Sequence, residues 1–209
     1  MKDIIKILKS INAITTDSHF VYTSGKHGSV YVRKDLLYPH TEITSDVCKM
    51  FADKFKNKKV DVVVAPALGG IVLSQWVAFH LSKLKGKEVL GLFTEKDENS
   101  NQVFKRGYDQ LVKGKNVLII EDLATTGGSI KKVIDSVRKA GGKIIGVGVM
   151  VNRDPKFVTS KSIGAPLSSL GTLEVESYDK DKCPLCKLKI PINTIVGHGK
   201  SFLAKHKQS

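Results

Sequence analysis

The sequence predicts an α/β fold in which a central parallel sheet is flanked by helices on both faces. Continuous apolar runs such as "VDVVVAP" and "KIIGVGVMV" are typical of strands that are buried on both faces. Segments with apolar residues at helical spacing lie between these runs. Because strand and helix alternate through Val151, the strands are expected to run parallel. The length of 209 residues suits one large domain with at most a modest appendage.

The elements can be predicted in chain order. Lysines alternate with isoleucine and leucine in residues 1–14, which predicts an amphipathic first helix and not a signal peptide. Residues 19–35, "HFVYTSGKHGSVYVRKD", contain two β-prone runs around a glycine-bearing turn and predict a hairpin. The following helix is expected to begin near Thr41. The further strands are predicted at 60–66, 88–93, 116–122 and 143–151, and the further helices at 71–84 and 130–142.

Two segments depart from this alternation. Residues 94–115 are polar, punctuated by glycine and long for a loop, so they predict a functional flap or a mobile hairpin. From about Tyr178 the chain is rich in lysine and contains "CPLC". We therefore expect a main domain over residues 1–178, including an N-terminal hood, and a tail over residues 179–209 packed on it.

Charge and cysteine content narrow the function classes. The net charge of +14 would suit nucleic acid or a polyphosphate substrate, or simply a lysine-rich surface. The lysines are scattered and never form a dense basic block, so nucleic acid is not the expected partner. Three cysteines give no disulfide framework, which favours a cytoplasmic location, and no apolar run is long enough to span a membrane.

The stretch "VLIIEDLATTGGS", from Val117 to Ser129, predicts a site for a sugar phosphate. Parallel sheets bind ligands at the carboxyl ends of their strands, and Glu121 and Asp122 come at such an end. Hydroxyls and close backbone N–H groups then precede a helix, which makes a phosphate cradle; its residues are Ala124, Thr125, Thr126, Gly127, Gly128 and Ser129. Carboxylates beside a phosphate suit ribose hydroxyls or Mg²⁺. The alternative is a buried strand followed by a glycine turn with capping threonines.

The same stretch resembles the phosphoribosyl-pyrophosphate signature of the type I phosphoribosyltransferases. Further stretches resemble one branch, the orotate phosphoribosyltransferases: "SGKHGSVYVRKDLLYPHTE", "DVVVAPALGGIVLSQWVA", "VNRD", "GAPLSSLGTLEVESYDKDKCPLCK" and "IPIN". The resemblance implies the type I fold, with a hood over the site, and a homodimer. It also implies transfer of the 5-phosphoribosyl group from phosphoribosyl pyrophosphate to orotate, with Mg²⁺ as cofactor.

The resemblance assigns roles residue by residue. It implies that Glu121 and Asp122 hold the ribose hydroxyls, and that Leu123 joins the residues to Ser129 around the 5-phosphate. Mg²⁺ would be carried by the substrate, with Asp122 its candidate protein ligand. The implied pyrophosphate ligands are Gly69, Gly70, Lys96 and Arg106, with Lys96 also catalytic, and the implied orotate ligands are Arg153, Thr125 and Lys26. An arginine fork suits the carboxylate of orotate.

The chain departs from the family pattern at two places. Leu68–Gly69 stands where many relatives have an aromatic–lysine pair, and the flap lacks the usual histidine. Two other functions therefore stay open: transfer to a purine or xanthine, and a non-catalytic regulator of the same fold that binds nucleic acid.

The cysteines and the remaining histidines are assigned no catalytic chemistry. Cys183 and Cys186 could begin a zinc site with His198 and His206, but that histidine spacing is wider than usual and no second CxxC exists. Packing of the tail against the domain is the favoured interpretation. Cys48 and Trp76 are expected in the core, and His19, His27, His40 and His80 have no predicted role.

Overall fold

The computed structural model describes residues 3–22 and 24–206, with His206 described in its backbone only. Its centre is a six-stranded sheet in the order β10-β9-β8-β5-β6-β7. Neighbouring strands from β10 to β6 pair in parallel, and β7 runs antiparallel at the edge. The strands are β5 (Val62–Pro66), β6 (Leu90–Lys96), β7 (Gln102–Val103), β8 (Asn116–Ala124), β9 (Lys143–Asn152) and β10 (Leu167–Thr172). The predicted α/β fold with a central parallel sheet is confirmed.

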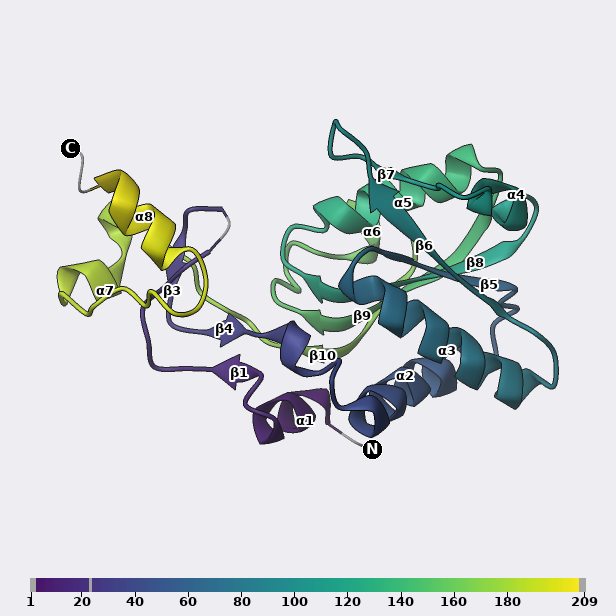
Figure 1. The fold of residues 1–209 in the computed structure, drawn as a ribbon, viewed down its shortest axis with the longest axis horizontal. Coiled ribbons are helices and arrows are strands. Elements are labelled where there is room, and N and C mark those ends of the chain that lie inside the picture. Colours follow the sequence, from purple (N-terminus) through teal and green to yellow (C-terminus); the bar gives the residue numbers. More distant parts are fainter. Residues whose placement is uncertain (1–2, 23, 207–209) are drawn as a thin grey trace.

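Helices cover both faces of this sheet (Figure 1). On one face, α2 (Thr41–Phe55) and α3 (Gly69–Lys85) pack with α1 (Ile4–Ser10) around one apolar cluster that includes the fully buried Phe51 and Leu118. On the other face, α5 (Gly128–Lys139) buries Ile130, Val133 and Ile134 against β8 and β9. Among the residues the structure describes, no helix is long and apolar enough to cross a membrane.

The order of the strands creates a crevice for a ligand at the carboxyl ends of β5 and β8. The chain passes from β5 to β6 on one side, then returns to place β8 on the other side of β5. At such a switch point the loops after the two central strands diverge and leave a crevice at their carboxyl ends. The loop after Pro66 and the turn after Ala124 therefore border the same crevice.

A small hood stands beside the carboxyl edge of the sheet. Here "the hood" means the hairpin of residues 19–22 and 24–28, built from β2 (Phe20–Val21) and β3 (His27–Gly28), together with the tail from Tyr178 to His206. The tail contains η2 (Lys180–Lys182), α7 (Pro184–Lys187) and α8 (Gly199–His206). Figure 1 shows α7 and α8 beside β3 and away from α3 and α5. The division at residue 178 stays a prediction.

Two local features differ from the sequence prediction. The second β-prone run of the hairpin, β4 (Tyr31–Val32), pairs instead with β1 (Ile14–Thr15). β10 and the short helix α6 (Ser160–Ile163) were not predicted. A hairpin was expected within residues 94–115 and is present: β6 pairs with β7, and α4 (Tyr108–Val112) follows. The Ser136 hydroxyl and Lys132 Nζ, both on α5, donate to carbonyls of this segment.

Candidate active site

The turn after β8 forms a small cavity of about 160 Å³. Its lining comprises Glu121, Leu123, Ala124, Thr125, Thr126, Gly127, Gly128, Ser129 and Ile130. The Thr125, Thr126 and Ser129 side chains are exposed, and α5 begins at Gly128. Gly127 has φ +72°, and an added Cβ would lie 3.1 Å from Ile163 Cγ2, so glycine is needed there. Hydroxyls and N–H groups at a helix N-terminus make this cavity suitable for phosphate.

Two buried carboxylates lie at the end of β8. Glu121 is 5% exposed and Asp122 is 2% exposed. Glu121 Oε1 accepts a hydrogen bond from the Asp122 N–H at 3.1 Å. Burial and then the charge of Asp122 raise the pKa of Glu121. Because neighbouring residues on a strand point to opposite faces, Glu121 faces the phosphate cavity while Asp122 faces the segment after β4.

Lys34 and Tyr38 bind Asp122, and neither was predicted. Lys34 Nζ lies 2.7 Å from Asp122 Oδ2, and the Tyr38 hydroxyl donates to the same oxygen at 2.8 Å. Asp122 Oδ1 accepts the Leu123 N–H at 2.7 Å. The pKa of Lys34 is raised: burial lowers it, and the charge of Asp122 outweighs that effect. The only sequence signal was a lysine and a tyrosine in "RKDLLY", inside the stretch that carried the family resemblance.

The loop after β5 approaches the same carboxylate. A Cβ added at Gly69 would lie 2.7 Å from Asp122 Oδ2 and would also contact the Tyr38 hydroxyl. At Gly70 it would lie 2.8 Å from Ala65 Cβ. Both glycines open α3 and so lie at a helix N-terminus. The expected pyrophosphate loop is therefore next to Asp122, where an anion could meet backbone N–H groups.

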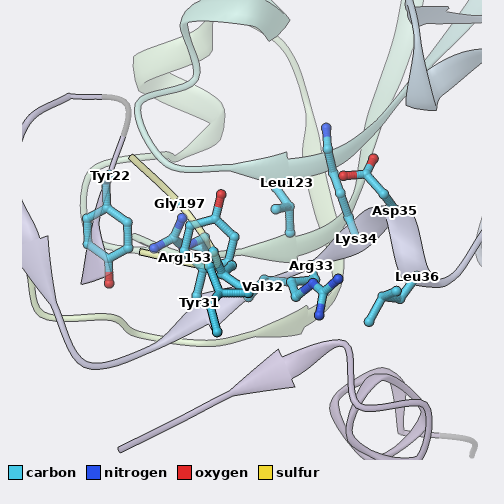
Figure 2. Close-up of a pocket in the computed structure, with 12 residues that line it drawn as sticks. Tyr22, Tyr31, Val32, Arg33, Lys34, Asp35, Leu36, Leu123, Arg153 and Gly197 are labelled. Atoms are coloured by element: carbon cyan, nitrogen blue, oxygen red, sulfur yellow. The ribbon is translucent and has the colours of Figure 1, made fainter. Parts of the chain in front are cut away.

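A larger cavity of about 430 Å³ shares Leu123 with the phosphate cavity. Figure 2 shows Tyr22, Arg153 and Tyr31 gathered in one part of it and Lys34 and Asp35 in another. The remaining lining is Val32, Arg33, Leu36, Ile195, Val196 and Gly197. The cavity thus combines aromatic rings with cationic side chains and has the tail as part of its wall.

Arg153 follows β9 and reaches into this larger cavity. Its guanidinium carbon lies 4.9 Å from the centre of the Tyr22 ring. The Tyr22 hydroxyl donates to Val30 O at 2.7 Å, which holds the ring in place. Within residues 3–22 and 24–206, the buried Arg153 Nε has no hydrogen-bond partner. A planar donor left unpaired in a cavity suits a carboxylate ligand.

The other expected ligands lie outside these two cavities in this structure. Lys26, in the hairpin turn, has its Nζ 4.0 Å from Asp179 Oδ1. Lys96 is exposed at the end of β6. Arg106 Nε donates to Glu95 Oε1 at 3.2 Å. The roles of all three in binding stay predictions.

Glu121 and Asp122 supply the hard oxygen donors that Mg²⁺ prefers. The two oxygens of Asp122 already accept three donors, from Leu123, Tyr38 and Lys34. Since Mg²⁺ takes about six oxygens, this donor set fits an ion that arrives with a polyphosphate better than one held by the protein alone.

Comparison with known proteins gives concordant results. The family model for the phosphoribosyl transferase domain matches residues 35–160. The chain is 36% identical to an orotate phosphoribosyltransferase of Caldanaerobacter subterraneus, over 90% of this chain and 93% of that protein. It is 38% identical to that of Desulforamulus reducens, over 91% and 93%. The crystal structure of Mycobacterium tuberculosis orotate phosphoribosyltransferase in complex with inorganic phosphate shares the fold, with TM-score 0.63, 19% identity and coverage of 82% and 96%.

Proposed function

The chain belongs to the phosphoribosyl transferase family, and we propose that it transfers the 5-phosphoribosyl group from phosphoribosyl pyrophosphate to orotate. The products are orotidine 5′-monophosphate and pyrophosphate, which is a step of pyrimidine synthesis. The relatives that support this assignment are orotate phosphoribosyltransferases, and the similarity covers 93% of the length of each.

The observation that carries the choice of base is Arg153. Its guanidinium lies in the larger cavity beside Tyr22, and its Nε has no partner among the described residues. Orotate differs from uracil by a carboxylate, and a charge-assisted hydrogen bond from the arginine fork would recognise that group. The rings of Tyr22 and Tyr31 offer apolar surface to the flat base. Purines lack a carboxylate and would leave the Arg153 Nε without a partner.

The remaining residues would position the sugar. The turn from Ala124 to Ser129 holds the 5-phosphate, which sets the ribose over the end of β8. There Glu121 and Asp122 bind its hydroxyls and offset the positive charge that develops as the bond to pyrophosphate breaks. Lys34 fixes the Asp122 carboxylate in place. Glu121 and Asp122 would hold the Mg²⁺ that arrives with the substrate, and this ion would supply positive charge beside the departing pyrophosphate.

Gly69 and Gly70 would receive the pyrophosphate at the N-terminus of α3. For Lys96 and Arg106 to reach it, the hairpin of β6 and β7 would have to close over the crevice, which would also exclude water. We infer that the protein acts as a cytoplasmic homodimer, as the family resemblance implies. Light scattering after size-exclusion chromatography measures the dimer directly.

A screen of bases tests the assignment. The purified protein is given phosphoribosyl pyrophosphate and Mg²⁺ with orotate, uracil, xanthine, guanine or adenine, and pyrophosphate release is followed. We expect turnover with orotate alone. Turnover with a purine would contradict the role of Arg153. If no base reacts while the sugar phosphate still binds, the protein is a regulator, and salt-dependent binding of RNA or DNA would then be measured.

Two variants of Arg153 test whether this residue recognises orotate. Arg153→Ala should lower kcat/KM for orotate by about 100-fold, because a charged hydrogen-bonded pair is worth about 3 kcal/mol. Arg153→Lys keeps the charge but loses the fork, and should recover only part of that loss. Arg138→Ala is the matched control: its guanidinium donates to Gly164 O, neither residue lines the two cavities, and activity should be retained. Equal activity of Arg153→Ala and the native protein would remove the basis of the assignment.

A further inference from the structure

Four potential metal ligands converge in the hood. The His19 and His27 rings and the Cys183 and Cys186 thiols each offer one ligand atom, and these atoms all lie within 4.8 Å of one another. His19, His27 and Cys183 are no more than 1% exposed, and Cys186 is half-buried. These residues do not line the 430 Å³ and 160 Å³ cavities. We propose that they form a structural zinc site.

Two different segments supply the ligands in pairs. In the hairpin, His27 stands opposite Val21, so His19 and His27 are diagonal neighbours on one face of the two strands. In the tail, "CPLC" gives the two-residue spacing that zinc-binding cysteine pairs have, with Cys183 preceding α7 and Cys186 within it. The hairpin therefore provides two nitrogens and the tail provides two sulfurs.

The distances suit tetrahedral coordination. Bond lengths of about 2.0 Å to nitrogen and 2.3 Å to sulfur give tetrahedron edges of about 3.3 Å for N–N and about 3.5 Å for N–S. Cys186 Sγ lies 3.3 Å from His27 Nδ1, and the Cys183 and Cys186 sulfurs each lie 3.7 Å from His19 Nε2. The two nitrogens are 2.8 Å apart and would separate by about 0.5 Å around an ion.

The surroundings orient His19 for this role. Its Nδ1 lies 2.8 Å from the carbonyl oxygen of Ile190, which can only accept a hydrogen bond. The proton therefore sits on Nδ1, and in the neutral ring Nε2 keeps its lone pair for a metal. The ring of His27 packs edge-on against Phe202 of α8 at 4.8 Å between centroids. Two sulfurs and two imidazoles in a tetrahedral arrangement favour zinc over magnesium or calcium.

The ion would fasten the tail to the hairpin. Hydrogen bonds already join them, from the N–H of Asn193 to His19 O at 2.7 Å and from the N–H of His198 to Val21 O at 2.9 Å. The hairpin contributes Tyr22 to the larger cavity, and the tail contributes Ile195, Val196 and Gly197. Zinc would therefore fix two parts of the wall of that cavity, at a position distinct from Glu121 and Asp122.

The metal content of the full-length protein, purified without a polyhistidine tag, tests the site. We expect one zinc per chain by inductively coupled plasma mass spectrometry. After removal of zinc with a chelator, Co²⁺ should give the visible absorption of tetrahedral coordination and a thiolate-to-cobalt charge-transfer band. The melting temperature should fall on removal of zinc and recover with zinc but not with magnesium, because an ion that binds only the folded chain stabilises it.

Variants assign the ligands. Cys183→Ser, Cys186→Ser, His19→Asn and His27→Asn should each lose the bound zinc. Cys48→Ala and His40→Gln are matched controls that change a cysteine and a histidine elsewhere, and both should keep it. The measurements on the native chain decide the question even if a ligand variant fails to fold. Less than about 0.1 zinc per chain with no cobalt spectrum, or a disulfide between Cys183 and Cys186 in the freshly purified protein, would overturn the proposal.

Discussion

Removing the ion pair between Lys34 and Asp122 is the strongest test of what holds the Asp122 carboxylate in the site. Replacing Lys34 with methionine keeps most of the side-chain volume and removes the charge. The Asp122 side chain is 3% exposed, so water cannot replace the lost partner. The carboxylate would keep the Tyr38 hydroxyl and the Leu123 N–H, so the fold should be weakened and not lost.

The magnitude follows from the geometry. At 2.7 Å and an effective dielectric constant of about 20, Coulomb's law gives an attraction of about 6 kcal/mol. Desolvation of the buried carboxylate offsets much of this attraction. The hydrogen bonds from the Tyr38 hydroxyl and the Leu123 N–H remain in the variant and reduce the loss of stability. We therefore expect a coupling energy of about 2 kcal/mol. For a chain of this size Lys34→Met should lower the melting temperature by about 4–8 °C.

A double-mutant cycle in urea isolates the coupling energy. The free energies of unfolding of Lys34→Met, Asp122→Asn and the double variant are compared with that of the native chain. The control cycle uses Lys156 and Glu174, whose charged atoms are 3.2 Å apart but whose side chains are 85% and 61% exposed. That pair should couple by about 0–1 kcal/mol.

The pH dependence of stability gives an independent check that the pair of Lys34 and Asp122 stabilises the fold. The pKa of Lys34 is raised above 10.5 in the folded protein. Its contribution to stability is therefore fully present below pH 10.5 and is lost as pH rises through the folded value. Above neutral pH, the difference in stability between the native chain and Lys34→Met should thus shrink only at strongly alkaline values. A coupling energy near zero, or a difference that disappears already at neutral pH, would refute the reasoning.

Three further outcomes are expected. Gly69→Ala would place a Cβ 2.7 Å from Asp122 Oδ2, so kcat/KM for phosphoribosyl pyrophosphate should fall at least about tenfold in steady-state assays. Gly148→Ala would place one 2.9 Å from Phe51 Cδ1 in the core, and should lower the free energy of unfolding measured in urea by about 1–3 kcal/mol. Burial raises the pKa of Cys48 to about 12, so iodoacetamide should label it in urea but not in the native protein at pH 8.

The core of the sheet could be predicted because its signals are local. β5, β8 and β9 each contain a continuous apolar run, and "EDLATTGGS" carries its carboxylates, hydroxyls and glycines close together in the sequence. By contrast, β10 has the sequence "LSSLGT" and is mostly half-buried. It has no continuous apolar run, and its one β-branched residue is Thr172. Its place is set by pairing with β9, which sequence periodicity does not encode.

The parts that could not be predicted are those in which distant segments meet. Lys34 and Asp122 are 88 residues apart, and nothing near Lys34 marks it as a partner for a carboxylate. The "CPLC" pair predicts half of a ligand set, and the only candidates it offers for the other half are the downstream His198 and His206, because spacing rules describe ligands that share one segment. The histidines beside it come from a hairpin more than 150 residues earlier. Only the pairing of Val21 with His27, and of the tail with that hairpin, turns two scattered histidines into neighbours of the two cysteines.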